Sequence, residues 1–224
     1  MNVIITGVSS GIGAELVSLF ENDPAIECIY ACSSSIDVIS VKGKVTNIPL
    51  DFKQKGAVDQ LLKYLSGCAV NILINNAGYL ECVPFAETSS ETLRDTLKVN
   101  FEGPFFLIQS LLPNLISGQA HIVNIGSMGG YQGSGKFPGL LAYSSSKAAL
   151  ANLTECLAEE LKAEKVTVNC LALGAVQTKM LEKAFPNYRA KVNSKEMASF
   201  IKNFSIHSTG VINGKVIPVS LDTP

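Results

Sequence analysis

The sequence predicts an α/β fold in which one doubly wound, parallel sheet of about seven strands carries helices on both faces. Two observations favour this class. Short, almost continuously apolar runs recur along the 224 residues, and stretches of helical periodicity lie between most of them. Such runs are typical of parallel strands buried on both faces, because the helices that connect parallel strands cover the sheet. No repeat or change of composition divides the chain, so we expect residues 1–224 to form a single domain.

The expected elements alternate from the first residues onward. Apolar runs followed by turn residues indicate strands, and apolar residues at intervals of three and four indicate helices. We expect strands at Val3–Thr6, Glu27–Cys32, Thr46–Leu50, Asn71–Asn75, His121–Gly126, Val166–Ala172 and Lys215–Val219. We expect helices at Ile12–Glu21, Gln54–Leu65, Thr88–Ile116, Leu140–Glu164 and Ser194–Phe204.

A glycine-rich turn joins the first strand to the first helix. It reads Thr6-Gly7-Val8-Ser9-Ser10-Gly11-Ile12-Gly13. Glycines let a backbone approach a ligand closely, and the N–H groups and dipole of a helix N-terminus favour a phosphate. A lone glycine-rich turn is more often only a turn. Its place after the first strand of an alternating chain nevertheless favours a nucleotide, so we expect this segment to bind a pyrophosphate.

Polar residues stand at the ends of two later strands and inside one helix. The segment Asn75–Gly78 (Asn-Asn-Ala-Gly) ends an apolar run, where its two amides could tie neighbouring strands together. Ser127 ends the next apolar run and could face a pocket or only cap a helix. Asn100 lies inside the helix expected at Thr88–Ile116, where an Asn slightly disfavours the helix and therefore needs a reason.

Tyr143 and Lys147 lie four residues apart in the helix expected at Leu140–Glu164. This spacing places both side chains on one face, about one turn apart. A phenol has a pKa of about 10, and a neighbouring ammonium favours the phenolate and lowers that pKa towards neutrality. The pair is therefore a candidate general acid–base, although Lys147 by itself could be a solvated helix lysine.

Taken together and in this order, these features resemble the short-chain dehydrogenase/reductase family, whose members have a Rossmann-type fold. The resemblance runs from residue 2 to residue 178. It implies that Asn100, Ser127, Tyr143 and Lys147 are catalytic. Tyr143 would exchange a proton with the substrate oxygen, and Ser127 would hold that oxygen. Lys147 would favour the phenolate and bind the nicotinamide ribose, and Asn100 would anchor a water that links Lys147 to solvent.

The resemblance also implies a nicotinamide dinucleotide as cofactor. Its binding residues would come from the glycine turn, the ends of the second and third strands, the Asn-Asn-Ala-Gly segment, the Tyr/Lys pair and the turn after the sixth strand. They are Gly7, Ser9, Ser10, Gly11, Ile12, Gly13, Ser33, Ser34, Asp51, Asn76, Ala77, Gly78, Tyr143, Lys147, Gly174, Val176 and Thr178.

The end of the second strand bears on the choice between NADP and NAD. Proteins that prefer NAD place an Asp or Glu there, which binds the ribose hydroxyl. Cys32 and Ser33 stand at this place instead. The hydroxyls of Ser33 and Ser34 could bind a 2′-phosphate, and Lys42 or Lys44 could reach it from the short link that follows. We therefore expect NADP(H), with NAD(H) as the alternative.

The composition bears on partners and location. Charged residues are 17% of the chain and the net charge is −1, which leaves no basic field for nucleic acid or an anionic membrane. No apolar run reaches the roughly 18 residues of a membrane-spanning helix, and no signal peptide is visible. The two histidines are far apart, so we expect no metal site. The cysteines are scattered, and we expect them to be the reduced, mostly buried thiols of a cytoplasmic protein: Cys28, Cys32, Cys68, Cys82, Cys156 and Cys170.

The glycine-rich loop 128–142 is long, so we expect an altered mouth of the substrate pocket. The residues expected around that pocket carry few charges, which favours a small, largely apolar ketone or aldehyde; they are Val83, Gly129, Tyr131, Leu140 and Leu181. The expected function is an oxidoreductase that interconverts a carbonyl and an alcohol, and the alternative is a non-catalytic NADP(H) sensor or scaffold. The helices Thr88–Ile116 and Leu140–Glu164 could form a homodimer, although their apolar stripes could equally be internal core.

Overall fold

A computed structural model describes residues 1–36, 39–65 and 67–223. The strands are β1 (Asn2–Thr6), β2 (Cys28–Ser33), β3 (Ser40–Lys42), β4 (Val45–Pro49), β5 (Ile72–Asn75), β6 (His121–Ser127), β7 (Thr167–Leu173), β8 (Val176–Gln177), β9 (Val192–Asn193) and β10 (Val216–Val219). The α-helices are α1 (Gly11–Glu21), α2 (Ala57–Tyr64), α3 (Ser90–Leu97), α4 (Gly103–Ser117), α5 (Leu141–Glu160), α6 (Lys179–Ala184) and α7 (Ser194–His207).

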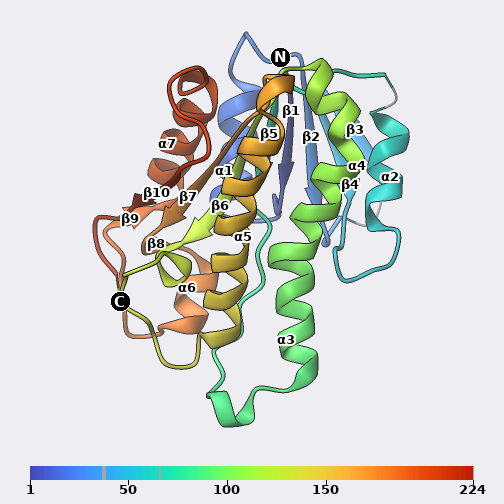
Figure 1. The fold of residues 1–224 in the computed structure, drawn as a ribbon. Coiled ribbons are helices and arrows are strands. Elements are labelled where there is room, and N and C mark those ends of the chain that lie inside the picture. Colours follow the sequence, from blue (N-terminus) through green and yellow to red (C-terminus); the bar gives the residue numbers. More distant parts are fainter. Residues whose placement is uncertain (37–38, 66, 224) are drawn as a thin grey trace.

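The central sheet has the strand order β10-β7-β6-β5-β1-β2-β4-β3 (Figure 1). Neighbouring strands are parallel, except that β3 is antiparallel to β4. The chain adds strands in one direction from β1 to β4 and in the other direction from β5 to β10. The order therefore reverses between β1 and β5. Ligands of open α/β sheets bind in the crevice at such a reversal, outside the carboxyl ends of the strands.

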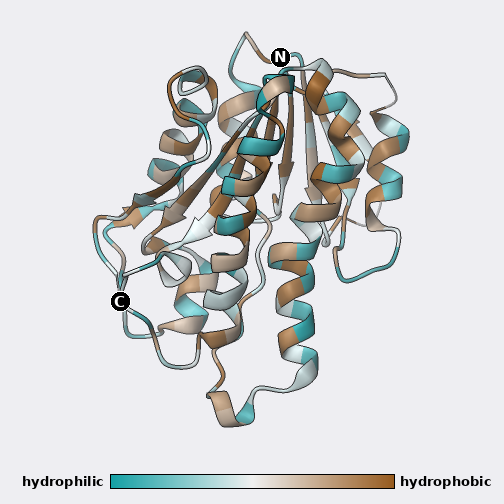
Figure 2. Ribbon diagram, in the orientation of Figure 1, coloured by the Kyte–Doolittle hydropathy of each residue, from teal (hydrophilic) through white to brown (hydrophobic). Residues whose placement is uncertain are grey.

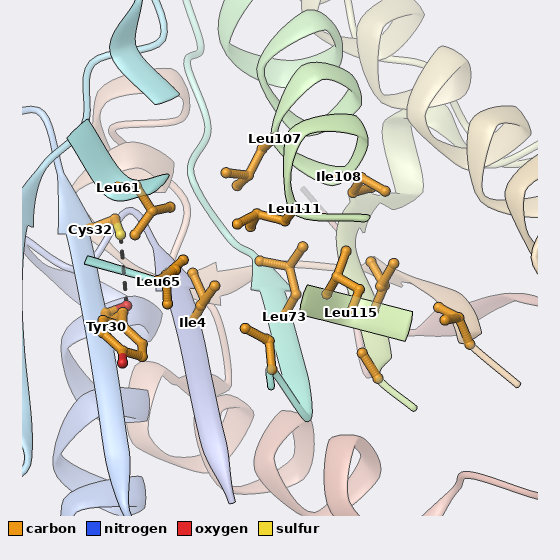
Figure 3. Packing of buried hydrophobic residues seen from close by; sticks show 14 of the residues in the cluster. Ile4, Tyr30, Cys32, Leu61, Leu65, Leu73, Leu107, Ile108, Leu111 and Leu115 are labelled. Atoms are coloured by element: carbon orange, nitrogen blue, oxygen red, sulfur yellow. Dashed lines mark hydrogen bonds between the residues drawn. The ribbon is translucent and has the colours of Figure 1, made fainter. Parts of the chain in front are cut away.

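Helices cover both faces of this sheet, as the sequence predicts. α2, α4 and α5 lie on one face, and α1 and α7 lie on the other (Figure 1). Figure 2 shows apolar strands between helices whose teal, hydrophilic positions alternate with brown ones. On the first face, Leu61, Leu107 and Leu111 pack over Ile4 and Leu73 (Figure 3), and all five are fully buried. Burying a side chain of this size contributes roughly 1.5–3 kcal/mol relative to exposing it.

The expected strands all form, within one or two residues of the predicted bounds, and make up the parallel part of the sheet. The eighth strand, β3, was not predicted. It pairs with β4 through a turn at Gly43, which has φ of +57°. All of its residues are exposed, so it carries no apolar run by which the sequence could reveal it.

The prediction of one continuous helix over Thr88–Ile116 is wrong. α3 ends at Leu97, α4 begins at Gly103, and a π-helical turn spans Lys98–Glu102 between them. Asn100 stands in the middle of this turn. Its buried side chain bonds to backbone groups outside the helix, which competes with regular helical geometry. Single π-helical turns inside helices frequently occur at functional sites.

Candidate active site

A cavity of about 370 Å³ lies at the carboxyl ends of β1, β5, β6 and β7. Ser127, Tyr143 and Lys147 line it. So do most of the residues expected to bind a cofactor, namely Gly7, Ser9, Ser10, Gly11, Ile12, Ser33, Ser34, Asp51, Asn76, Ala77, Gly78, Gly174, Val176 and Thr178. Gly13 and Asn100 do not line this cavity, but they contact residues that do, Gly7 and Tyr79 respectively.

The glycine turn between β1 and α1 is packed too closely for side chains. Gly7 has φ of +73°, in the left-handed region that glycine adopts at little cost. A Cβ atom on Gly13 would lie 2.1 Å from the Gly7 carbonyl oxygen. The absence of side chains at these two positions lets the turn fold tightly against the start of α1.

The N-terminus of α1 is open towards the cavity. Ser10 stands at the N-cap without a side-chain hydrogen bond to the helix, and the first turn of α1, all of it described, contains no acidic residue. α7 differs, since Asn193 and Glu196 cap its first turn reciprocally. The first N–H groups of α1 therefore remain available to an anion, and this cradle fits the pyrophosphate of a dinucleotide.

Hydrogen bonds tie the glycine turn to the segment after β5. The Asn76 side chain donates to the carbonyl oxygens of Thr6 and Gly7, at 3.0 Å each. The Thr6 hydroxyl accepts from the Ala77 N–H at 3.0 Å. The side chain of the preceding residue, Asn75, ties two neighbouring strands together, as the sequence suggests. Its Nδ2 donates to Asn124 Oδ1 at 2.8 Å and so links β5 to β6. The two loops on either side of the strand-order reversal are thus held together.

Asn100 is fully buried and joins three segments of the site. Its Oδ1 accepts from the Tyr79 N–H at 2.8 Å, and its Nδ2 donates to the Tyr79 carbonyl at 2.9 Å. The same Nδ2 donates to Ser146 Oγ at 2.9 Å, and Ser146 in turn donates to the Tyr143 carbonyl at 2.7 Å. Ser146 therefore couples Asn100 to the turn of α5 that carries Tyr143. The sequence did not single out Ser146, although it directly precedes Lys147.

Lys147 is buried, with 3% of its surface exposed. Its Nζ donates to the Ile125 carbonyl at 2.7 Å. Burial lowers the pKa of Lys147 to about 8, and the nearby Cys170 thiol acts weakly in the opposite direction. Both Lys147 Nζ and Asn100 Oδ1 lie 3.8 Å from the point where a Cβ atom on Gly78 would stand. Gly78 therefore leaves an open space beside both polar groups.

Burial raises the pKa of Tyr143, and a hydrogen bond with the Ser127 side chain lowers it by a smaller amount. The net direction is opposite to the one expected from the Tyr143/Lys147 pair alone. Lys147 Nζ lies 5.9 Å from the centre of the Tyr143 ring and is bonded to the Ile125 carbonyl. In this arrangement, loss of water around the phenol outweighs the effect of the ammonium on its pKa.

At the end of β2, the structure shows which side chains face the cavity and which face the core, a distinction that the sequence left open. Ser33 and Ser34 line the cavity. Cys32 instead points into the apolar cluster beside Leu61 and Tyr30 (Figure 3), and burial raises the pKa of its thiol to about 12. The residue that takes the place of the acidic side chain of NAD-preferring proteins is therefore Ser33, because strand alternation turns Cys32 to the opposite face.

The expectation that Lys42 or Lys44 could reach a cofactor phosphate is wrong. Lys44 Nζ donates to the carbonyl oxygens of Asp23 and Ile26, at 2.7 and 3.2 Å. Lys42 pairs with Val45, the first residue of β4. Both lysines thus stand at the amino ends of the parallel strands. The β3–β4 hairpin, which the sequence did not reveal, carries them away from the cavity.

The apolar part of the cavity is built from segments that precede Tyr143 in the sequence and segments that follow Lys147. Gly129, Leu140 and Leu181 line it as expected, but Val83 and Tyr131 do not. Tyr131 lines a second groove of about 1520 Å³ along the outer side of α5. Further lining residues that the sequence did not single out are Leu80, Met128, Phe137, Met180, Ala184 and Phe185. The last three follow Thr178 in the mixed segment 179–185, where apolar residues between charged ones at helical spacing were the available signal.

All six cysteines are free thiols, but only Cys32 and Cys170 are buried. Cys82 and Cys156 are exposed, so the expectation of mostly buried thiols is wrong. These two stand on a loop and on a helix rather than in the core strands. Within the described residues, no group of three or more His, Cys, Asp or Glu side chains is arranged to hold a metal ion. None of the helices in the same part of the chain is both long and apolar enough to cross a membrane.

Comparisons with known proteins identify the family of the chain. The sequence profile of a family described as short chain dehydrogenase matches residues 1–189. The chain is 31% identical over 186 residues to a hydroxy(phenyl)methylsuccinyl-CoA dehydrogenase subunit of Thauera aromatica, covering 79% of this chain and 73% of that protein. It is 34% identical over 201 residues to the short-chain dehydrogenase PC-15 of Penicillium crustosum, covering 87% and 72%.

Two solved structures share the fold over almost the whole chain. One is a 4-hydroxyisoleucine dehydrogenase mutant complexed with NADH and succinate, with a TM-score of 0.86, 22% identity and coverage of 98% of this chain and 97% of that one. The other is a Beutenbergia cavernae protein with bound NADP, with a TM-score of 0.84, 25% identity and coverage of 98% and 94%.

Proposed function

Since the chain belongs to the short chain dehydrogenase family of oxidoreductases, we propose that it interconverts a carbonyl and an alcohol by hydride transfer, with NADP(H) as cofactor and Tyr143 as general acid–base. The observation that carries this proposal is the single cavity that joins Tyr143 to the open N-terminus of α1. Hydride transfer needs a proton-transfer group and a dinucleotide site that face one another. Residues 1–224 would act as one NAD(P)-binding domain.

The nicotinamide supplies or accepts the hydride when the cofactor is bound. Tyr143 would donate its proton to the carbonyl oxygen during reduction and accept one from the alcohol in reverse. Ser127, which lies near enough to Tyr143 to lower the pKa of the phenol, would hold the same oxygen. Because burial raises the pKa of Tyr143, the phenol carries its proton at neutral pH.

Lys147 and Asn100 would assist proton transfer by Tyr143. With a pKa of about 8, Lys147 is mostly protonated at neutral pH and can donate to the ribose hydroxyls of the nicotinamide half. Its charge would favour the phenolate that forms when Tyr143 gives up its proton. The open space beside Gly78 adjoins both Lys147 Nζ and Asn100 Oδ1, and a water there would return a proton from solvent.

NADP(H) rather than NAD(H) is proposed on the basis of the turn after β2. Ser33 and Ser34 line the cavity where a carboxylate would bind the ribose hydroxyls in an NAD-preferring protein. Asp51 is the one acidic residue among the described residues that line this cavity. With Lys42 and Lys44 placed elsewhere, serine hydroxyls and backbone N–H groups would bind the 2′-phosphate.

The proposed substrate is a small, largely apolar ketone or aldehyde, or the corresponding alcohol. Leu140 and Leu181 line the same cavity as Tyr143, and Asp51 is the one carboxylate among the described residues that line it. The Thauera aromatica relative is named for an alcohol whose carbon bears a phenyl group. That name is consistent with a carbonyl beside an apolar substituent in this chain.

The alternative function is a non-catalytic NADP(H) sensor or scaffold. It requires a cofactor site without a working proton-transfer group. Asn100, Ser127, Tyr143 and Lys147 are all present, which favours the enzyme. Ser146 links Asn100 to the Tyr143 carbonyl, and Lys147 donates to the Ile125 carbonyl on the strand that ends in Ser127.

A homodimer would use the outer faces of α3, α4 and α5. Leu93, Phe105, Phe106 and Leu141 on these helices are between 37% and 51% exposed. Apolar side chains gathered on neighbouring helices are typical of an interface between subunits. Sedimentation velocity of the purified chain tests this proposal.

A cytoplasmic location stays a prediction from the cysteine content.

The deciding experiment is a fluorescence titration with NADPH and NADH, followed by a panel of ketones, diketones and aldehydes. We expect tighter binding of NADPH and oxidation of NADPH by at least one carbonyl. Tighter binding of NADH would overturn the cofactor proposal alone. Tight NADPH binding without turnover across the panel would reject the enzyme in favour of the sensor.

A further inference from the structure

Two phenylalanine rings meet across the mouth of the cavity. Phe137 lies in the long glycine-rich loop, and Phe185 directly follows α6. Their ring centres are 5.5 Å apart, and the ring planes meet at 74°, which is an edge-to-face arrangement. Both residues line the cavity that contains Tyr143 and Lys147. The pair therefore joins the segments that flank the substrate side of the site.

The backbone holds both rings in place. The Leu140 N–H donates to the Phe137 carbonyl at 3.2 Å, in a turn that contains Gly139 with φ of +81°. On the other side, the Phe185 N–H donates to the Leu181 carbonyl at 2.8 Å and ends α6. Leu140 and Leu181, which fix these backbones, themselves line the cavity.

Neither ring serves the core of the protein. Phe137 and Phe185 are both partly exposed, and neither belongs to the two clusters of buried side chains that fill the faces of the sheet. Two large apolar side chains that are held outside the core, against a cavity, therefore call for a functional explanation.

We propose that Phe137 and Phe185 form an aryl-recognition wall, which selects carbonyl substrates that carry a flat aromatic ring over saturated substrates of the same size. This inference rests on the proposed function and names its substrate class. The edge-to-face pair presents ring faces and edges at which a third aromatic ring finds favourable offset or edge-to-face contacts. A saturated ring of equal volume buries similar apolar area but lacks these contacts.

The remaining lining supports this class. Met128, Leu140, Met180 and Leu181 add apolar and polarizable surface, and thioether sulfurs make favourable contacts with aromatic rings. Lys53, Lys147 and Lys179 are the cationic side chains among the described residues that line the whole cavity. An aryl ketone or aldehyde needs no ion pair with them, so these apolar side chains suffice to bind its ring.

The test compares two ketones that differ in aromaticity and hardly in volume, acetophenone and cyclohexyl methyl ketone. In the assay each ketone is reduced to its alcohol while NADPH is oxidised, and the proton comes from Tyr143. The readout is the ratio of kcat/KM for the two ketones. Phe137→Leu and Phe185→Leu keep apolar volume and remove the ring. The matched control is Phe200→Leu on α7, where Phe200 is 43% exposed and stacked on Phe204 outside the cavity.

We expect the wild-type chain to prefer acetophenone, and each cavity variant to lower the ratio about tenfold, which is the scale of one well-placed apolar or aromatic contact. The control should leave the ratio within about twofold. A ratio that stays unchanged in both cavity variants would overturn the aryl-recognition wall, and so would a wild-type preference for the cyclohexyl ketone.

A second readout separates this inference from the proposed function. Tyr143→Phe leaves the wall intact and should stop turnover, so acetophenone binding to its NADPH complex can be titrated at equilibrium. Binding that is weakened about tenfold by an added Phe185→Leu change supports the wall even if no ketone is turned over. Turnover of aliphatic carbonyls, together with no preferential binding of acetophenone, would reject the wall and leave the oxidoreductase in place.

Discussion

Two buried polar networks lie at opposite ends of the central sheet, and they differ in how completely their groups are paired. At the amino end, both ring nitrogens of His121 have partners. Nε2 accepts from Asn169 Nδ2 at 3.0 Å, and Nδ1 therefore carries the proton and donates to the Ser205 carbonyl at 3.0 Å. The Asn169 side chain is also fully used, since it donates to the Ile212 carbonyl and accepts from the Lys215 N–H.

At the carboxyl end, Lys147 is almost as buried as His121 but is paired far less completely. Its ammonium has three N–H donors, and the Ile125 carbonyl is the one hydrogen-bond acceptor it meets in the described part of the chain. A buried cation without a carboxylate partner costs free energy. We infer from this difference that the His121 network stabilises the fold, whereas the buried charge of Lys147 lowers its stability. Such a cost is expected where a charge serves the proposed function beside Tyr143.

The largest change in activity should come from Tyr143→Phe, which removes the phenolic hydroxyl beside the Lys147 network and leaves the ring. We expect kcat to fall about 1000-fold, because general acid–base catalysis contributes about 10²–10⁴-fold. The dissociation constant of NADPH should change by no more than about twofold, since the proposed function places the phenol at the reacting oxygen rather than at the dinucleotide. Tyr131→Phe, in the outer groove, is the matched control. Substantial turnover in the Tyr143 variant would remove this residue from the chemistry.

Lys147→Met should abolish turnover and weaken NADPH binding while it stabilises the fold. Met keeps the volume of the side chain and removes the buried charge. We expect the free energy of unfolding at pH 7 to rise by about 1–3 kcal/mol. Urea unfolding measures this, with the exposed Lys162→Met change as control.

The gain from Lys147→Met should shrink as pH rises. Burial lowers the pKa of Lys147 in the folded chain from 10.5 to about 8, so the unfolded chain binds more protons between these values. Stability of the wild-type chain therefore rises with pH across this window, and the advantage of the variant disappears. An advantage that is equally large at pH 7 and pH 10 would contradict the assignment of a buried charge.

His121→Leu should have the opposite signature, with lower stability and normal chemistry. It leaves the Asn169 N–H and the Ser205 carbonyl without partners, and such a loss costs about 1–3 kcal/mol for each buried group. We expect urea unfolding to show a loss of about 2 kcal/mol or more, with kcat within about twofold of the wild type. His207→Leu, at an exposed position, is the control. A large loss of kcat with unchanged stability would reverse the roles of the two networks.

The smallest effect should be the response of His121 to acid. Burial lowers its pKa below the ordinary value of 6.5, and the hydrogen bond to Ser205 opposes this weakly. The unfolded chain therefore binds the proton first, and the stabilising contribution of the neutral ring is lost as pH falls below 6.5. The loss amounts to at most about 1.4 kcal/mol per pH unit. Urea unfolding between pH 7 and pH 5 should show this dependence in the wild-type chain and not in His121→Leu.

Much of the fold and of the candidate site could be predicted from short-range patterns. The strands around Ile4 and Leu73 follow from unbroken apolar runs, because a parallel strand is buried on both faces. The glycine turn at Gly7 follows from sterics that act within a few residues. Other features depend on contacts between distant segments. The sequence indicated only that Asn100 slightly disfavours the helix expected around it. The bonds from Tyr79 and Ser146 to its side chain, which accompany the π-helical turn, come from distant segments.

Residue identity and local spacing thus determined most of the strand and helix pattern, the glycine turn before α1 and the pairing of Tyr143 with Lys147 on one helix face, since periodicity and glycine sterics act over a few residues. Tertiary structure alone decided which chemistry those residues can carry. It turned Cys32 into the core and Ser33 towards the cavity, and it carried Lys44 to the far end of the sheet. Burial, which the order of residues does not state, moved the pKa values of Lys147 and Tyr143, because loss of water depends on every segment packed around a group.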